Sequence, residues 1–107
     1  MNEFIRSLHR EFPDDAVPHR HEGYSVKKIP CCYLLSNPDR KHVLKLTETS
    51  LLVLELCNGS FNVGEILDFL VSQYPEAAST IKRDVFRVLD EFSEENVITV
   101  RTTGYSE

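Results

Sequence analysis

The sequence predicts a single small α+β domain in which a three-stranded antiparallel β-meander is followed by a three-helix bundle. Short segments between residues 24 and 46 are rich in β-forming residues and bounded by turn residues. Residues 48–96 carry apolar side chains at helical spacing. The chain has 107 residues, which suits one domain. We expect an arm and linker over 1–21, the domain over 22–102 and a frayed tail over 103–107.

The first 21 residues combine an apolar stripe with helix-breaking residues. Pro13 and Pro18 end any helix that begins in the stripe, so we expect a short amphipathic arm followed by a loose linker. The stripe docks on the domain, joins two copies into a homodimer, or stays disordered, and the sequence leaves these alternatives open. Its members are Phe4, Ile5, Leu8 and Phe12.

Three strands are expected at 24–29, 32–36 and 41–46. The residues at 37–40 fit a hairpin connection, because Pro38 fixes φ early in the turn and its Asn and Asp neighbours satisfy backbone groups. Side chains alternate between the two faces of a strand. In the third strand one face takes His42, Leu44 and Leu46, and the other takes Val43 and Lys45.

Two helices with clear start signals follow the strands. Thr47 is the expected N-cap of a helix over 48–57, which Gly59 would end in a left-handed conformation. Asn62 and Glu65 have the spacing of a capping box for the second helix. Its stripe consists of Val63, Ile66, Leu67, Leu70, Val71 and Tyr74.

A third helix is expected to run to Asn96, with Ser79 or Thr80 as its N-cap. A short strand over 97–102 follows, because apolar and polar residues alternate there. The two long helices should supply most of the core. The third stripe consists of Ile81, Val85, Val88, Leu89 and Phe92.

Composition and charge exclude several classes of protein. The chain is 41% hydrophobic and 27% charged, and it contains no apolar run long enough for a membrane span or a signal peptide. We therefore expect a cytoplasmic protein. The net charge is −5, with 8 Lys/Arg and 6 Asp/Glu in residues 1–46 and 4 and 11 in residues 47–107. An acidic second half gives no counterion-release term for nucleic-acid binding.

The cysteines and histidines do not form a recognisable metal or disulfide pattern. Cys31, Cys32 and Cys57 form neither a paired framework nor a Cys-x-x-Cys motif, so reduced thiols are expected. Neighbours on a strand point to opposite faces, which disfavours joint metal ligation by the first two. His19 and His21 sit beside Pro18 in the predicted linker, where solvated side chains are expected rather than metal ligands.

No catalytic constellation is visible, so we expect a protein that is not an enzyme and needs no cofactor. The four glycines are scattered and form no phosphate loop. A helix bundle beside a hairpin also describes a winged helix, which raises the alternative of DNA binding. The charges of the third helix argue against it. Three basic residues (Lys82, Arg83, Arg87) are outnumbered there by Asp84, Asp90, Glu91, Glu94 and Glu95.

An ordered set of short motifs resembles the PqqD family. The motifs are Leu46-Thr47-Glu48-Thr49-Ser50, Leu56-Cys57-Asn58-Gly59, Val63-Gly64-Glu65-Ile66, Tyr74, and Asp84-Val85 with Leu89 and Phe92. The resemblance implies a winged-helix-like module of three strands and three helices. Such a module binds the leader of a ribosomally made precursor peptide and presents it to a modifying enzyme, often a radical SAM protein.

The resemblance also implies where the peptide lies: it adds as a strand against 41–46 and rests in the groove beside the third helix. An edge strand has unpaired backbone groups that serve as a template for such addition. Arg87 and Lys45 suit peptide carboxylates, and Asp84 and Glu91 suit basic groups. The remaining alternative is an interaction or dimerisation domain. The candidate peptide-binding residues are His42, Val43, Leu44, Lys45, Asp84, Arg87, Val88 and Glu91.

Overall fold

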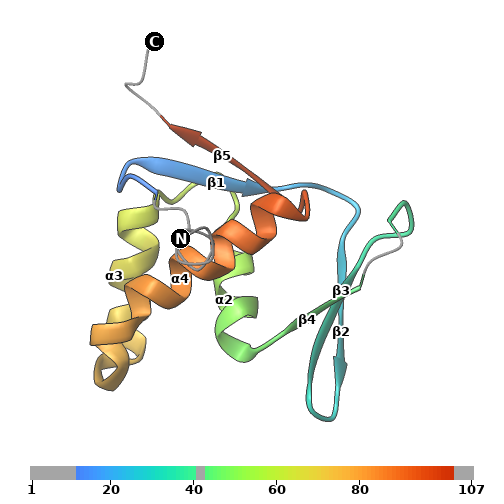
Figure 1. Cartoon of the computed structure of the whole chain (residues 1–107), viewed down its shortest axis with the longest axis horizontal. Helices are drawn as coiled ribbons and strands as arrows, with labels where there is room; N and C mark the ends of the chain where they lie inside the picture. Colours follow the sequence, from blue (N-terminus) through green and yellow to red (C-terminus); the bar gives the residue numbers. More distant parts are fainter. Residues whose placement is uncertain (1–11, 41–42, 103–107) are drawn as a thin grey trace, which may run out of the picture.

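The computed structural model describes residues 12–40 and 43–102, which form five strands and three α-helices (Figure 1). The amphipathic arm predicted at the start of the chain lies outside the described residues, except for Phe12. In chain order the elements are β1 (Ala16–Arg20), β2 (Ser25–Ile29), β3 (Cys32–Ser36), β4 (Leu44–Leu46), α2 (Glu48–Leu56), α3 (Val63–Gln73), the short 3₁₀ helix η1 (Pro75–Ala77), α4 (Ala78–Glu94) and β5 (Ile98–Thr102).

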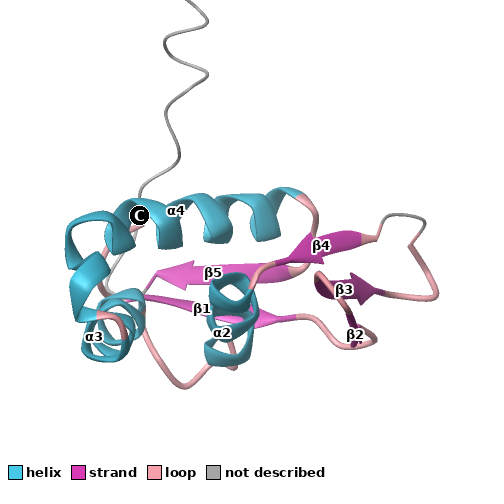
Figure 2. Ribbon diagram, turned by 90° about the horizontal axis from the view of Figure 1, so that it is seen from below, coloured by secondary structure: helices cyan, strands magenta, loops and turns pink. Residues whose placement is uncertain are grey.

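The strands are divided between two sheets, whereas the sequence analysis expected one. β2, β3 and β4 form an antiparallel sheet in that order, and β1 pairs with β5 in a separate antiparallel ribbon. The expected α+β class and three helices are therefore present, and the terminal strand is confirmed. Both views show the three-stranded sheet beyond the C-terminal end of α4 (Figures 1 and 2).

β1 occupies a stretch that the sequence analysis assigned to a loose linker. Pro18 is typical of a break between elements, but here it lies in a two-stranded ribbon, where a missing N–H is tolerated. It pairs with Val100 and is itself buried, as is Ala16. β1 is also tied to the end of α2: the N–H of Arg20 donates to the carbonyl of Cys57 at 2.8 Å, and the N–H of Gly59 donates to the carbonyl of Pro18 at 3.1 Å.

The starts of α2 and α3 follow the sequence signals. The Thr47 hydroxyl accepts a hydrogen bond from the N–H of Ser50 at 3.1 Å, so Thr47 is the N-cap. Asn62 and Glu65 form a reciprocal capping box, with bonds of 2.8 and 2.9 Å. These bonds satisfy N–H groups that the first helical turn leaves without partners.

α4 begins earlier than expected, so the assignment of Ser79 or Thr80 as its cap was wrong. The turn of η1 leads directly into the helix at Ala78, and the Thr80 hydroxyl donates to the carbonyl of Ala77 at 3.2 Å. The helix ends at Glu94. Asn96 then takes a left-handed φ of 62°, a conformation that Asn tolerates better than most residues.

The core lies among the three helices, which pack against one another and against the same side of the β1–β5 ribbon (Figure 1). Every apolar member of the α4 stripe is buried, which confirms the predicted helical pattern. Phe12 also joins this core and meets Phe86 edge-to-face, with ring centroids 5.8 Å apart. None of the described helices is long and apolar enough to cross a membrane.

Candidate functional site

β4 is an edge strand of the three-stranded sheet. Its inner side pairs with β3 through Leu35↔Leu44, Leu34↔Lys45 and Tyr33↔Leu46, and no described strand pairs with its outer side. The predicted alternation is present: Leu46 is buried and Leu44 half-buried, while Lys45 is exposed. The inward side chains fix β4 on the core. A strand edge without a paired strand is the kind of surface to which an extended peptide can add.

A pocket of about 300 Å³ lies between the start of β4 and the C-terminal end of α4. Its lining combines apolar residues such as Leu35 and Leu44 with charged residues such as Arg40 and Glu94. Its full lining consists of Tyr24, Leu35, Arg40, Leu44, Glu94, Glu95 and Val97.

His21 holds one wall of this pocket in place. Its Nδ1 lies 2.7 Å from the carbonyl oxygen of Asn96, and its Nε2 lies 2.5 Å from the Thr99 hydroxyl. Its backbone N–H donates to the carbonyl of Val97 at 2.8 Å. His21 was predicted to be a solvated side chain; it is half-buried and joins the end of β1 to the turn after α4.

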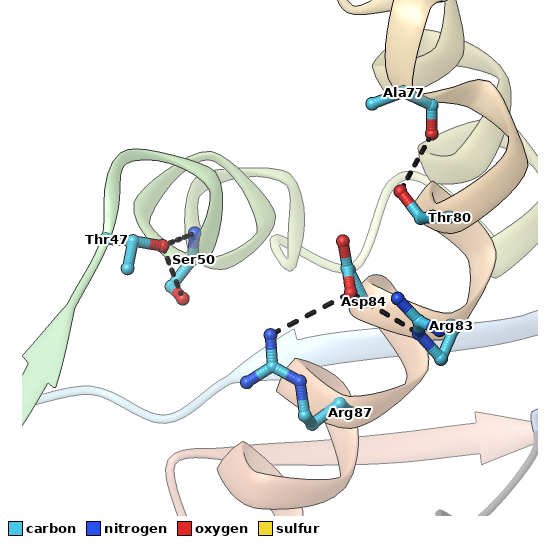
Figure 3. Close-up of polar contacts among 7 residues, drawn as sticks. All are labelled: Thr47, Ser50, Ala77, Thr80, Arg83, Asp84 and Arg87. Atoms are coloured by element: carbon cyan, nitrogen blue, oxygen red, sulfur yellow. Dashed lines mark hydrogen bonds and ion pairs between the residues drawn. The ribbon is translucent and has the colours of Figure 1, made fainter.

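One flank of α4 continues from the pocket toward the first turn of α2. Asp84, Arg87 and Glu91 are spaced at i, i+3 and i+7, which places them on the same side of the helix. Asp84 lies 3.8 Å from Arg83 and 4.0 Å from Arg87. Figure 3 shows Asp84 and Arg87 facing the start of α2. Ion pairs this exposed contribute about 0–1 kcal/mol each, so the charges remain available to a ligand.

The structure places the eight predicted site residues in different surroundings. Leu44 is half-buried and lines the pocket. Val43 and Lys45 are exposed at the strand edge, and Asp84, Arg87 and Glu91 lie along the helix flank. Val88 is 2% exposed, so its side chain packs in the core and is not available to a ligand. His42 lies outside the described residues.

Sequence reasoning missed most of the pocket lining. Glu94 and Glu95 follow Glu91 by three and four residues, so helical periodicity could have extended the flank to them. Tyr24 and Val97 had no local signal. They reach the pocket because the chain returns to one place before β2 and after α4.

Within the described residues, the site shows binding features and no grouping of metal ligands. Three or more His, Cys, Asp or Glu side chains placed to hold a metal ion are not found there. Cys57, the thiol at the end of α2, is buried, and burial raises its pKa to about 12 even though Arg20 acts to lower it. At neutral pH this thiol is protonated and inert as a nucleophile.

The fold and groove define a small α+β domain that offers a strand edge, a neighbouring charged helix and a pocket between them. The chain belongs to the family described as coenzyme PQQ synthesis protein D (PqqD), whose family model matches residues 32–98. This confirms the resemblance drawn from the motifs. A curated protein named PqqA binding protein, from Bradyrhizobium diazoefficiens, is 31% identical over 80 residues, covering 75% of this chain and 76% of the relative. No solved structure matches the chain.

Proposed function

We propose that this protein binds a PqqA-type precursor peptide by adding the peptide as a strand to the outer edge of β4. The observation that carries the proposal is the open edge of β4 beside the pocket at the end of α4. Family membership and the name of the curated relative support it. The protein then acts as a binding partner that holds the peptide, without performing chemistry on it.

The short edge of β4 requires side-chain contacts as well as backbone pairing. The strand has three residues, so a peptide gains only a few hydrogen bonds at about 0.5–1.5 kcal/mol each. Ordering each peptide residue costs about 1–2 kcal/mol. Burying one Leu- or Phe-sized side chain contributes about 1.5–3 kcal/mol, and the pocket beside Leu44 is placed to accept it.

The charges suggest how the peptide is oriented. Glu91 and Glu94 form no ion pair within the described residues, and both lie on or next to the flank that reaches the pocket. Arg40 and Lys45 lie on the strand side of the groove. We therefore propose that basic peptide side chains face α4 and acidic ones face β4.

Strand addition can be tested with modified peptides while the protein stays unchanged. N-methylation removes one backbone donor, and only alternate residues of an added strand point their N–H groups at the partner. A series of singly N-methylated PqqA-type peptides should show weakened binding at every second position of the bound segment. Uniform loss, or no loss at any position, in a calorimetric titration would contradict strand addition.

Charge reversal on α4 tests the orientation. The double change Glu91→Lys and Glu94→Lys should weaken binding of a peptide with a basic residue beside its apolar anchor by about twofold to thirtyfold, since exposed pairs contribute about 0.2–1 kcal/mol each. The matched control is Asp68→Lys with Glu76→Lys, which makes the same charge change at exposed positions on α3 and η1. Equal loss of affinity in both double variants would mean that the change in net charge explains the result, and it would contradict a direct contact with Glu91 and Glu94.

Two finer parts of the proposal concern partners. We propose that the bound peptide is presented to a modifying enzyme of the radical SAM type in the cytoplasm, which co-purification of protein, peptide and enzyme would test. We also propose a homodimer through the N-terminal arm. Because β1 belongs to the fold, the test is sedimentation of the full chain beside a chain that starts at Phe12, and equal association states would exclude the arm from the assembly.

A further inference from the structure

The tip of the β2–β3 hairpin brings two thiols together. Ile29 pairs with Cys32 as the last register pair, so Pro30 and Cys31 form the two-residue turn. The sequence analysis expected neighbouring cysteines on a strand to point to opposite faces. Only Cys32 belongs to a strand, and the turn rotates Cys31 so that the two Sγ atoms lie 3.5 Å apart.

This thiol pair is accessible and lies beside a cavity. Cys31 is exposed and Cys32 is half-buried, in contrast to the buried Cys57. Both cysteines line a cavity of about 370 Å³ that extends to Thr47, the residue after β4. A small oxidant can therefore reach the pair without unfolding the hairpin.

The two sulfurs differ in their surroundings. Partial burial, the hydrogen bond with Cys31 and the proximity of that thiol raise the pKa of Cys32, while the ammonium of Lys45 acts to lower it. Cys32 is thus held as a thiol in contact with its neighbour. The exposed Cys31 is the sulfur that meets solvent first.

We propose that Cys31 and Cys32 form a dithiol site that a hydroperoxide oxidises reversibly to a disulfide between neighbouring residues. The Cys31 sulfur attacks the hydroperoxide, the O–O bond breaks, and a sulfenic acid and an alcohol or water form. The Cys32 sulfur then attacks the Cys31 sulfur, the S–O bond breaks, and hydroxide leaves with the Cys32 proton as water. Two thiols lose two electrons, and the hydroperoxide gains them.

The short distance between neighbouring residues makes the Cys31–Cys32 disulfide easy to reduce. Neighbouring Cα atoms are about 3.8 Å apart, below the usual range of about 4.4–6.8 Å for a disulfide. Strain of this kind makes a disulfide more oxidising, so ordinary monothiols such as glutathione reopen it. The dithiol is the resting form, and Tyr33, the next residue of β3, pairs with Leu46 of the candidate peptide edge.

Peptide mapping after peroxide treatment of the full-length protein tests the site. No Lys or Arg lies between Ile29 and Arg40, so one tryptic peptide holds both cysteines and excludes Cys57. We expect stoichiometric hydrogen peroxide to lower the mass of this peptide by two hydrogen atoms, and glutathione to restore it. Cys57→Ala is the control, and it should form the Cys31–Cys32 disulfide as the wild type does.

Trapping experiments identify the two roles. Dimedone, which captures sulfenic acids, should label Cys31 several-fold more in Cys32→Ser than in the wild type, and Cys31→Ser should give no closed form. Phenylarsine oxide, which bridges two neighbouring thiols, should bind the wild type and neither serine variant. The proposal is overturned if the arsenical does not bind, if peroxide gives only intermolecular disulfides, or if wild-type Cys31 accumulates the dimedone adduct.

Discussion

Ser93 on α4 has a buried hydroxyl that forms no hydrogen bond within the described part of the chain. An unsatisfied buried polar group costs about 1–3 kcal/mol, and Ala has a higher helix propensity than Ser. Ser93→Ala should therefore raise the free energy of unfolding by about 1 kcal/mol in urea denaturation.

Ser72 on α3 is the matched control. Its hydroxyl donates to the carbonyl of Phe69 at 2.7 Å, and the residue is exposed. Ser72→Ala should change the free energy of unfolding by less than about 0.5 kcal/mol. Equal stabilisation by both changes would show that helix propensity, and not the buried hydroxyl, is responsible.

Cys57 makes folding stability depend on pH in the alkaline range. Its pKa rises from an ordinary 9.0 to about 12 in the folded state, so between these values the unfolded chain loses a proton that the folded chain keeps. The free energy of unfolding should therefore be unaffected by this group below pH 9 and fall above it, with a slope approaching about 1.4 kcal/mol per pH unit. Cys57→Ala should show a shallower decline in the same denaturation series. Identical slopes would mean that other groups cause the loss.

The residue scale also shows what local sequence signals can predict. Thr47 and the Asn62–Glu65 capping box were predicted correctly, because each bond joins residues within one helical turn. The contact between Cys31 and Cys32 was missed. The two thiols meet because β3 begins at Cys32 and leaves Cys31 in the turn, and strand boundaries are the hardest feature to predict from sequence.

Among the elements, β1 depends most on its neighbours. It is held on one side by β5 and on the other by the segment after α2, where His19 forms a bridge with Asn58. Gly59 makes this second contact possible. It has a φ of 83°, and a Cβ added there would lie 2.6 Å from Cδ2 of His19.

Gly59→Ala should lower the free energy of unfolding by at least about 1 kcal/mol, because a left-handed conformation is unfavourable for Ala and the new methyl group would displace His19. Gly64→Ala is the comparison, since Gly64 lies in the first turn of α3 with neighbouring atoms no closer than 3.4 Å. It should have a small effect in the same assay. An equally small effect of Gly59→Ala would mean that the β1 anchor adapts freely.

The helices could be predicted from sequence because their apolar period is local. β1 could not, because its partner β5 lies at the other end of the chain and its Pro18 is typical of a linker. The β1–β5 sheet was not predicted for the same reason. The residues of one strand carry little information about a partner strand that is distant in the sequence.

At the scale of the whole molecule, the candidate groove joins distant parts of the chain. Tyr24 precedes β2, Leu44 belongs to β4, and Val97 follows α4, yet all three line one pocket. The family resemblance predicts a site between the strand edge and the third helix. It does not predict the pocket, because the pocket walls come from residues before β2, in β4 and after α4.

The most direct test of the central claim is an NMR titration of the isotope-labelled protein with a PqqA-type precursor peptide. Binding at the proposed groove predicts progressive amide shift changes at 43–46, in and just before β4, and at 91–97 around the end of α4, with little change on α3. Shift changes confined to α3 or β2, or none at high micromolar peptide, would contradict it.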